Sequence, residues 1–345
     1  MVARLAGMFA MRHWLLSVLL SAALTAAAAL PASAQTKVKI MVGGLDKQIY
    51  LPAKLADQLG HFKDEGLDVE LFNSNSGSQA ATALLAREVQ AVVGFYDHTI
   101  DLQSKGKIIT NVVQLLVAPG EVELVSAKTP QYADPKNWKG QALGVTGLGS
   151  ATDFLTRFIA VKAGLRAQDV TAVPVGAGDT FLSALTQGKI VAGMTTEPTV
   201  QRALTQGAAT IAIDLRTPET TRAALGGDYP ASCVYMDAAF LAGNKDTAQK
   251  IVNAFVKTLK WMDAHSPEEI ADKMPKDYLA GERDLYVKGL REGRKQFSTD
   301  GRMPEGAAEN VLAVLKAFSP SVQNKTIDLA KTYTAEFVNK ANATH

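Results

Sequence analysis

The sequence predicts an α/β protein built from two similar lobes, each an open sheet with helices on its faces. Residues 141–164 carry the clearest unit: an apolar run, a turn with three glycines and a Ser/Thr pair, and apolar residues at helical spacing. Residues 38–95 show the same alternation of strands and helices. This order returns 101 residues further along the chain, which indicates two related sheets.

The elements of the first lobe alternate along the chain. They are a strand at residues 38–42, a helix from Pro52 to near Gly60, a strand at 67–72, the polar loop 73–78, a helix through Ala86, and a strand at 91–95. We expect the side chain of Ser78 or Gln79 to cap the second helix. In the second lobe, Ser150 or Thr152 is expected to cap the helix that follows the glycine-rich turn.

The two lobes are aligned by the shift of 101 residues. Asp68-Val69 then matches Asp169-Val170, and Tyr96-Asp97 falls opposite Glu197-Pro198. Few residues are identical, so chance similarity between two βαβ units stays an alternative. If the repeat is real, both lobes have the same topology.

Open α/β sheets bind ligands at the carboxyl ends of their strands, and pockets favour the boundary between domains. Six turns are therefore expected to face one cleft: Gly43–Gln48, Asn73–Gln79, Tyr96–His98, Thr146–Thr152, Gly176–Asp179 and Glu197-Pro198. Helix N-termini with glycines and hydroxyls can hold an anion through backbone N–H groups. For each turn alone, an ordinary βα turn is the alternative. The glycine spacing fits neither a dinucleotide-binding fingerprint nor a P-loop.

Extended segments at residues 122–125 and 232–235 are flanked by Gly and Pro, and we place the two hinge crossings there. Lobe 1 then comprises residues 35–121 and 233–345, and lobe 2 comprises residues 122–232. The chain after about Asp237 has helical periodicity, and these helices are expected to pack on lobe 1, with Trp261 in the core. Ser266-Pro267-Glu268-Glu269 predicts a capping box at the start of one of them.

The N-terminus has the features of an export signal. Arg4 and Arg12 precede the apolar run Trp14–Leu30, and Ala32-Ser33-Ala34 fits signal-peptidase cleavage after Ala34. No cysteine follows the apolar run, so a lipid anchor is disfavoured. The expectation is a soluble protein in the periplasm, and an uncleaved membrane anchor is the alternative.

Composition indicates an ordinary globular protein, with 47% hydrophobic and 20% charged residues among 345. The formal net charge is +2, and removal of the two leader arginines leaves equal numbers of basic and acidic residues. A basic surface for nucleic acid is therefore not expected. The single cysteine, Cys233, excludes an internal disulfide and any multi-cysteine metal site.

Several motifs are spread over nearly the whole mature chain: Gly66-Leu67-Asp68-Val69-Glu70, Ser76-Gly77, Asn137-Trp138-Lys139-Gly140, Gly149-Ser150-x-Thr152-Asp153, Lys162-Ala163-Gly164-Leu165 and Thr196-Glu197-Pro198. They resemble the solute-binding proteins of bacterial ABC importers. The resemblance is to the nitrate, sulfonate and taurine branch, which also includes binders of thiamine-pyrimidine precursors.

The resemblance implies a type II periplasmic-binding-protein fold, with two Rossmann-like lobes joined by two hinge strands. Such proteins close over a small molecule and deliver it to a permease and ATPase complex in the inner membrane. It also implies that the loops at Gly77-Ser78-Gln79 and Gly149–Thr152 hold an acidic group of the ligand. Sulfonate binders usually have proline in place of Ser78, so this chain departs from that pattern, and taurine or a simple alkanesulfonate is disfavoured.

The residues expected to contact the ligand come from the turns at the strand ends. They are Gly44, Leu45, Asp46, Ser76, Gly77, Ser78, Tyr96, Asp97, His98, Thr146, Gly149, Ser150, Ala151, Thr152 and Glu197. For Tyr96, Asp97 and Glu197, packing between elements or charging a helix N-terminus is the alternative. No metal ligand, cofactor or catalytic residue is expected, and we expect a monomer.

An enzyme is disfavoured by missing motifs. There is no G-x-S-x-G elbow, and His61, His98 and His265 are scattered without metal-binding spacing. A thiamine-pyrimidine synthase of this fold would need thiol signatures that Cys233 alone does not supply. We therefore expect capture of a small organic anion, a sulfonate, carboxylate or aromatic acid. A sensory ectodomain of the same fold and a secreted enzyme are the alternatives.

Overall fold

The computed structural model describes residues 35–279 and 281–344 of the chain. The predicted export signal and the alternative of a membrane anchor fall on residues 1–34, outside the described residues. Within the described ranges, none of the helices is both long and apolar enough to cross a bilayer. Residues 36–345 form one compact unit.

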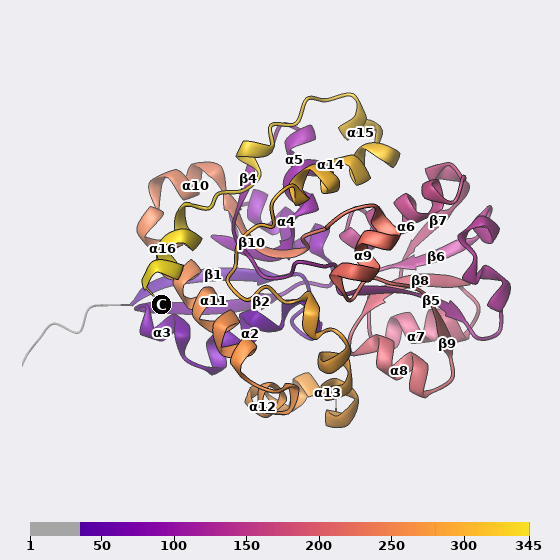
Figure 1. Cartoon of the computed structure of the whole chain (residues 1–345), viewed down its shortest axis with the longest axis horizontal. Coiled ribbons are helices and arrows are strands. Elements are labelled where there is room, and N and C mark those ends of the chain that lie inside the picture. The colour runs from indigo at the N-terminus through magenta and orange to yellow at the C-terminus, as the bar shows by residue number, and fades with distance from the viewer. Residues whose placement is uncertain (1–34, 280, 345) are drawn as a thin grey trace, which may run out of the picture. The chain divides into compact units, whose positions relative to one another are not determined.

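Two five-stranded mixed sheets form the centre of this unit (Figure 1). The first has the order β2-β1-β3-β10-β4 and consists of β1 (Thr36–Val42), β2 (Leu67–Asn73), β3 (Ala91–Phe95), β4 (Ile109–Gln114) and β10 (Ser232–Asp237). The second has the order β7-β6-β8-β5-β9 and consists of β5 (Glu121–Ser126), β6 (Ala142–Val145), β7 (Thr171–Pro174), β8 (Ala192–Thr196) and β9 (Ala209–Asp214). The predicted strands of the first lobe are confirmed as β1, β2 and β3.

The two sheets have the same topology. Three parallel strands lie side by side in each, and an antiparallel strand follows them: β10 between β3 and β4, and β5 between β8 and β9. The shift of 101 residues carries β3 directly onto β8. The weak sequence repeat therefore corresponds to a shared order of strands.

Helices connect the strands of each sheet. In the first half they are η1 (Gln48–Tyr50), α2 (Leu51–Gln58), α3 (His61–Asp64), α4 (Gly77–Leu85) and α5 (Asp97–Ser104). In the second half they are η2 (Pro130–Ala133), η3 (Pro135–Trp138), α6 (Ala151–Lys162), η4 (Ala167–Asp169), α7 (Asp179–Thr186), α8 (Thr199–Thr205) and α9 (Pro218–Leu225). Pro52 lies in the first turn of α2, as predicted.

The chain passes between the sheets at residues 115–120 and 215–231. Each passage runs directly into one of the two strands predicted at the hinge, β5 and β10. We propose that the lobes divide along the sheets, with residues 35–121 and 233–345 in lobe 1 and residues 122–232 in lobe 2.

The C-terminal part of the chain after β10 is helical, as predicted. Its elements are α10 (Ala238–Gly243), α11 (Lys245–Ala264), α12 (Pro267–Lys273), η5 (Lys276–Leu279), α13 (Arg283–Glu292), η6 (Arg294–Gln296), α14 (Ala307–Phe318), α15 (Pro320–Gln323), η7 (Leu329–Lys331) and α16 (Glu336–Thr344). Most pack on lobe 1, but α13 also contacts α8, and α14 contacts α6. The C-terminal helices therefore reach both lobes.

Trp261 does not lie in the core as predicted. It is partly exposed and stacks on His265, with ring centroids 3.8 Å apart. The buried face of α11 is formed by other side chains, among them Phe255, Leu259 and Met262. The predicted capping box of the next helix is confirmed: Ser266 and Glu269 cap α12 reciprocally.

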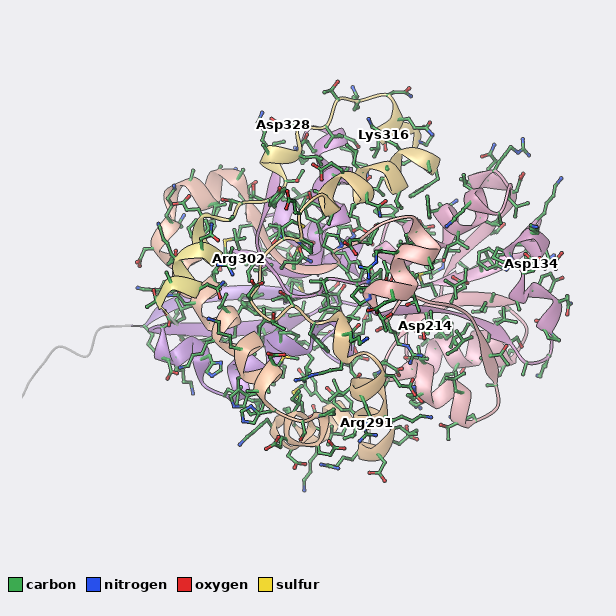
Figure 2. The ribbon with its side chains drawn as sticks, viewed as in Figure 1. Asp134, Asp214, Arg291, Arg302, Lys316 and Asp328 are labelled. Atoms are coloured by element: carbon green, nitrogen blue, oxygen red, sulfur yellow. The ribbon has the colours of Figure 1, made fainter. Side chains whose placement is uncertain are left out.

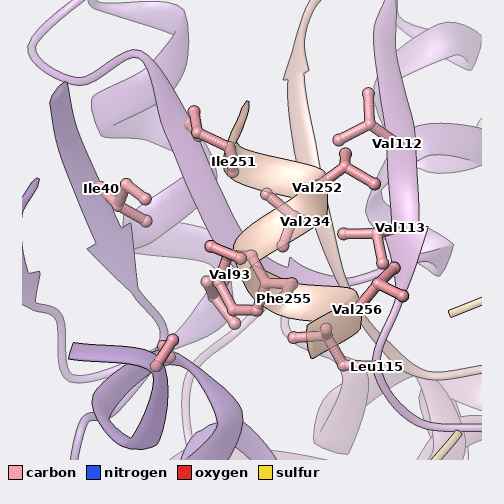
Figure 3. Close-up of a cluster of buried hydrophobic side chains, with 14 of the residues drawn as sticks. Ile40, Val93, Val112, Val113, Leu115, Val234, Ile251, Val252, Phe255 and Val256 are labelled. Carbon is pink, nitrogen blue, oxygen red and sulfur yellow. The ribbon is translucent and has the colours of Figure 1, made fainter. Parts of the chain in front are cut away.

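The core of lobe 1 lies where α11 covers the sheet (Figure 3). Ile251 and Phe255 of α11 contact a fully buried layer that includes Ile40, Val93 and Val234. These three strand residues belong to β1, β3 and β10. β3 is apolar and buried along its whole length, which suits a strand covered on both faces. Charged side chains such as Arg291 and Lys316 are exposed on the outside (Figure 2).

A close approach in the second sheet gives a test of the fold. Gly193 of β8 pairs with Gly144 of β6, and a Cβ on Gly193 would lie 2.8 Å from the carbonyl oxygen of Gly144. Because that atom is backbone, Gly193→Ala should lower the free energy of unfolding by about 1–3 kcal/mol. Urea unfolding followed by circular dichroism would measure it. Gly243→Ala is the control, since nothing lies within 4 Å of a Cβ there, and it should be neutral or stabilising.

Candidate ligand-binding site

A cavity of about 960 Å³ lies between the two lobes, at the carboxyl ends of their strands. Its lining comes from the turns after β1 and β2 in lobe 1 and after β6 and β7 in lobe 2. The C-terminal residues Asp277 and Tyr278 complete the wall. This cavity, which we call the main cavity, is large enough for a small organic molecule.

A second, much smaller cavity of about 10 Å³ adjoins the main cavity and shares Lys47 and Thr146 with it. We call it the inner cavity. Its lining comes from both lobes and from the start of β5, and consists of Lys47, Ile49, Tyr50, Gly77, His98, Glu121, Thr146, Ser150, Ala151 and Thr196. The first turns of α4 and α6 therefore both border this space, and their backbone N–H groups have no acceptor within their own helix.

The two lobes touch directly beside these helix N-termini. A Cβ on Gly147 would lie 2.7 Å from both Cβ and Oγ of Ser76. Gly77 lies equally close to His98, since a Cβ there would be 2.7 Å from Cε1 of the imidazole. Only glycine fits at both positions, and the absence of side chains is what lets the turns approach.

Hydroxyl groups hold the turn between β6 and α6 in shape. The backbone N–H of Thr146 donates to Oγ1 of Thr152 (2.9 Å), and the hydroxyl of Ser150 donates to the carbonyl of Gly147 (2.6 Å). Ser150 occupies the N-cap position of α6 without a side-chain capping bond. The expectation that Ser150 or Thr152 caps this helix is therefore wrong, because their hydroxyls bond within the turn.

The N-cap of α4, the corresponding helix in lobe 1, lies two residues before the first position predicted for it. Ser76, not Ser78 or Gln79, is the N-cap of α4, and its Oγ accepts from the backbone N–H of Gln79 (3.4 Å). The hydroxyls of Ser76 and Ser78 lie 3.1 Å apart. Both serines line the main cavity, so both are available to a ligand there.

Lys47 is the cation of the site, and the sequence-based candidates did not include it. Its ammonium group donates to the carbonyls of Gly43 (2.7 Å) and Asn75 (3.2 Å), and the side chain is buried. Among the described residues, no carboxylate lies within ion-pair distance of it. Burial lowers the pKa of Lys47 from 10.5 to about 8. A lone lysine in the turn after a strand gave no distinctive signal in the sequence.

Buried acids lie on the hinge side of the site, on β5 and α5. Burial raises the pKa of Glu121 well above its usual value and that of Glu123 to about 8. One oxygen of Glu123 accepts from the hydroxyl of Thr156 (3.1 Å). Burial also raises the pKa of Asp97, which accepts from the hydroxyl of Tyr229 (2.9 Å). Burial therefore favours the protonated form of all three carboxyls.

The other candidate residues fall into three groups. Leu45, Asp46, Ser76, Ser78 and Thr146 line the main cavity. Gly77, His98, Thr146, Ser150 and Ala151 line the inner cavity. Gly44, Gly149 and Thr152 shape the turns without lining either space, and Tyr96, Asp97 and Glu197 line neither.

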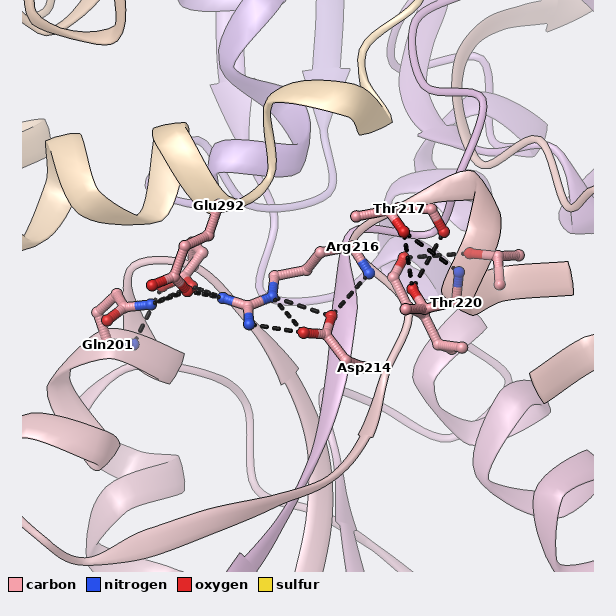
Figure 4. A network of polar contacts seen from close by, with 9 residues as sticks. Gln201, Asp214, Arg216, Thr217, Thr220 and Glu292 are labelled. Carbon is pink, nitrogen blue, oxygen red and sulfur yellow. Dashed lines mark hydrogen bonds and ion pairs between the residues drawn. The ribbon is translucent and has the colours of Figure 1, made fainter. Parts of the chain in front are cut away.

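Tyr96 and Glu197 have structural partners instead. The hydroxyl of Tyr96 lies 2.5 Å from Oγ1 of Thr332, in a fully buried position. Glu197 pairs with Arg216 (2.9 Å), which also pairs with Asp214 and with Glu292 of α13. Figure 4 shows Arg216 between Asp214 and Glu292, with Gln201 beside them. This cluster ties lobe 2 to α13 and leaves Glu197 away from the cavities.

The described residues contain no cluster of three or more His, Cys, Asp or Glu side chains that could hold a metal ion. The only thiol of the chain, Cys233, is buried in β10, and burial raises its pKa well above the usual value. A buried protonated thiol is a poor nucleophile.

Residues 50–270 match the sequence model of the family described as NMT1/THI5 like. The chain belongs to this family. One relative in this group of proteins, YtlA of Bacillus subtilis (strain 168), is provisionally named a binding protein. It is 22% identical over 268 residues, which cover 76% of this chain and 78% of YtlA.

A second relative carries an enzyme name. The 4-amino-5-hydroxymethyl-2-methylpyrimidine phosphate synthase of Aspergillus parasiticus is 28% identical over 238 residues, which cover 66% of this chain and 67% of the relative. The family relatives therefore include proteins named as binding proteins and as synthases.

Solved structures confirm the predicted fold. A protein of Bordetella bronchiseptica RB50 is 37% identical, with a TM-score of 0.86, and the match covers 90% of this chain and 98% of that one. The periplasmic nitrate-binding protein NrtA of Synechocystis PCC 6803 has a TM-score of 0.69 at 13% identity, covering 90% and 89% of the two chains. The alkanesulfonate-binding protein SsuA of Xanthomonas axonopodis pv. citri has a TM-score of 0.70 at 13% identity, and the match covers 88% of this chain and 99% of SsuA.

The contact between the lobes can be tested by adding one methyl group. Gly147→Ala should separate the two turns, because its Cβ would overlap Ser76. The expected results are a larger radius of gyration in small-angle X-ray scattering and faster amide exchange at residues 76–79 and 146–152. Gly243→Ala is again the control. Unchanged scattering and exchange would show that the turns accommodate the methyl group without separating.

The buried acid on β5 gives a pH test. The carboxyl of Glu123 ionises near pH 4.5 when unfolded and near pH 8 when folded, so its contribution to stability is full below pH 4.5 and is lost as the pH rises through 8. Glu123→Gln should therefore flatten the fall of the urea midpoint between about pH 5 and 8. The exposed Glu305→Gln is the control. An equally steep fall in Glu123→Gln would contradict the assignment.

Proposed function

We propose that this protein is the solute-binding component of an ABC importer. In this proposal it captures a small organic anion, a sulfonate, carboxylate or aromatic acid, in the main cavity, and the lobes close on the ligand by bending at the hinge. Nitrate and alkanesulfonate are the ligands named for two proteins of the same fold. Because those proteins are only 13% identical to this chain, the ligand class rests on the site itself.

The observation that carries this proposal is the ammonium group of Lys47. It is buried at the junction of both cavities, where the N-termini of α4 and α6 also point, and its hydrogen bonds go to two carbonyls. A buried cation is costly unless a counter-charge compensates it. An anionic ligand supplies that counter-charge, and the positive ends of both helix dipoles favour it further.

Specific residues have proposed roles in binding. The hydroxyls of Ser76, Ser78 and Thr146 are positioned to donate to the acidic group, and the exposed Leu148 supports the body of the ligand. For Tyr96, Asp97 and Glu197 we propose a structural role in place of ligand contact, since they line neither cavity.

The proposed setting is the periplasm, with a permease and ATPase complex as partner and the protein acting as a monomer. The predicted export signal supports it, as does the periplasmic origin named for NrtA. A receptor that signals instead of transporting is the alternative. Loss of ligand uptake on deletion of this gene, with restoration by the wild-type gene, would support the importer role; unchanged uptake would favour the receptor.

A synthase is the second alternative, because relatives carry that name. The buried thiol of Cys233 argues against a cysteine-based reaction here. Incubating the protein with its bound ligand and following the ligand by mass spectrometry would decide the matter. A binding protein returns the ligand unchanged, whereas conversion of the ligand would establish an enzyme.

Binding is tested by calorimetry with ligands found by native mass spectrometry or a thermal-shift screen of organic acids. Lys47→Met removes the charge but keeps the length of the side chain, and should weaken binding by about 1.5–3 kcal/mol, since a charged hydrogen bond is lost. Lys316→Met on the exposed face of α14 is the control. Equal affinity of Lys47→Met and wild type would contradict the proposed anion site.

A further inference from the structure

We propose that the inner cavity is a specificity subsite that binds one hydroxyl or uncharged amino group of the ligand, so that the preferred ligands are hydroxy acids or aromatic amino acids of the aniline type. This inference rests on the proposed capture of an organic acid. It adds which kind of acid is selected and which residues select it.

Two buried polar atoms without partners define the subsite. Oε2 of Glu121 and Nε2 of His98 have no hydrogen-bond partner among the described residues, and both side chains line the inner cavity. Glu121 is 3% exposed and His98 is 2% exposed. Leaving such an atom unpaired destabilises the folded protein, so buried polar atoms nearly always have a partner. A polar group of the ligand would satisfy both atoms at once.

The size of the inner cavity limits what can enter. A space of about 10 Å³ corresponds to one water-sized group. A sulfonate, a carboxylate or a ring is too large, so the acidic group and body of the ligand remain in the main cavity. Because Lys47 and Thr146 line both spaces, a substituent on the ligand body can reach inward while the acid stays outside.

The chemistry of the walls favours a neutral group. His98 directs Nδ1 to the hydroxyl of Tyr235 (3.4 Å), which leaves Nε2 for the cavity. Burial raises the pKa of Glu121 and so favours its protonated form, and a protonated carboxyl can both donate and accept a hydrogen bond. The nearby ammonium of Lys47 repels a second cation, and Asp97 and Glu123, the other acids that act on Glu121, have raised pKa values themselves. An alkylammonium group is therefore disfavoured relative to a hydroxyl.

The test uses matched pairs of acids in thermal-shift and calorimetric titrations at pH 7. In the first series, the parent acid benzoate is compared with 3-hydroxybenzoate, 4-hydroxybenzoate and 4-aminobenzoate. In the second series, the parent acid ethanesulfonate is compared with 2-hydroxyethanesulfonate and taurine. In at least one series the hydroxyl or aniline member should bind at least tenfold more tightly than its parent, and taurine should bind no better than ethanesulfonate. Equal affinities within every series that binds would overturn the subsite while leaving the proposed anion site intact.

Variants assign any preference to the two residues. Glu121→Met and His98→Phe should abolish the preference, so that the hydroxyl member binds no more tightly than its parent acid. Glu121→Gln should retain the preference, because an amide copies the donor and acceptor of a protonated carboxyl. Circular dichroism and urea midpoints would verify that each variant is folded. A preference that survives both Glu121→Met and His98→Phe would overturn the assignment.

The two proposals fail in different ways. If no acid of either series binds, and native mass spectrometry identifies a neutral or cationic ligand, both the anion site and this subsite are rejected. If acids bind and Lys47→Met weakens them, but no hydroxyl preference exists, only the subsite is rejected.

Discussion

The site depends on one close contact, that of Gly147 in lobe 2 with Ser76 in lobe 1. A single methyl group would not fit between them. This contact brings the N-termini of α4 and α6 to the same small space, one from each lobe. Neither helix end alone is a specific site, since a helix N-terminus is a common feature of βα turns. Two of them with a buried ammonium between them form a cradle that a lone turn does not provide.

Burying Lys47, Glu121 and His98 next to this contact has a cost in stability. Each group loses its hydration, and Oε2 of Glu121 and Nε2 of His98 gain no protein partner in return. Apolar residues of similar size would be more stable at these positions. The retention of polar groups in a packed region is typical of functional sites, where stability is given up for binding.

The C-terminal helices modify the two-lobe design. Glu197 and Tyr96-Asp97 occupy corresponding turns in the repeat, and both turns have partners within the protein. Glu197 forms an ion pair with Arg216, which also pairs with Glu292 of α13. The hydroxyl of Tyr96 forms a hydrogen bond with Thr332. Glu292 and Thr332 both come from the segment that follows β10. Hinge bending would therefore have to rearrange α13 and α14 as well as the two passages between the sheets, because these helices contact both lobes.

The sequence by itself determined the local architecture. Alternating apolar runs, Pro52 in a first helical turn and the Ser266–Glu269 capping box predicted elements that the structure confirms, because these signals act between residues close in the chain. The antiparallel position of β10 between β3 and β4 and of β5 between β8 and β9, the ion cluster at Arg216 and the place of Lys47 were decided only by the tertiary structure. Their partners lie far away in the sequence, and a lone lysine or glutamate carries no local signal of burial. The misassigned caps have a local cause instead. Ser150 and Thr152 had the right chemistry for capping, but the conformation of the turn directs their hydroxyls to Gly147 and Thr146. In lobe 1, Ser76 takes the capping position that was assigned to Ser78 or Gln79.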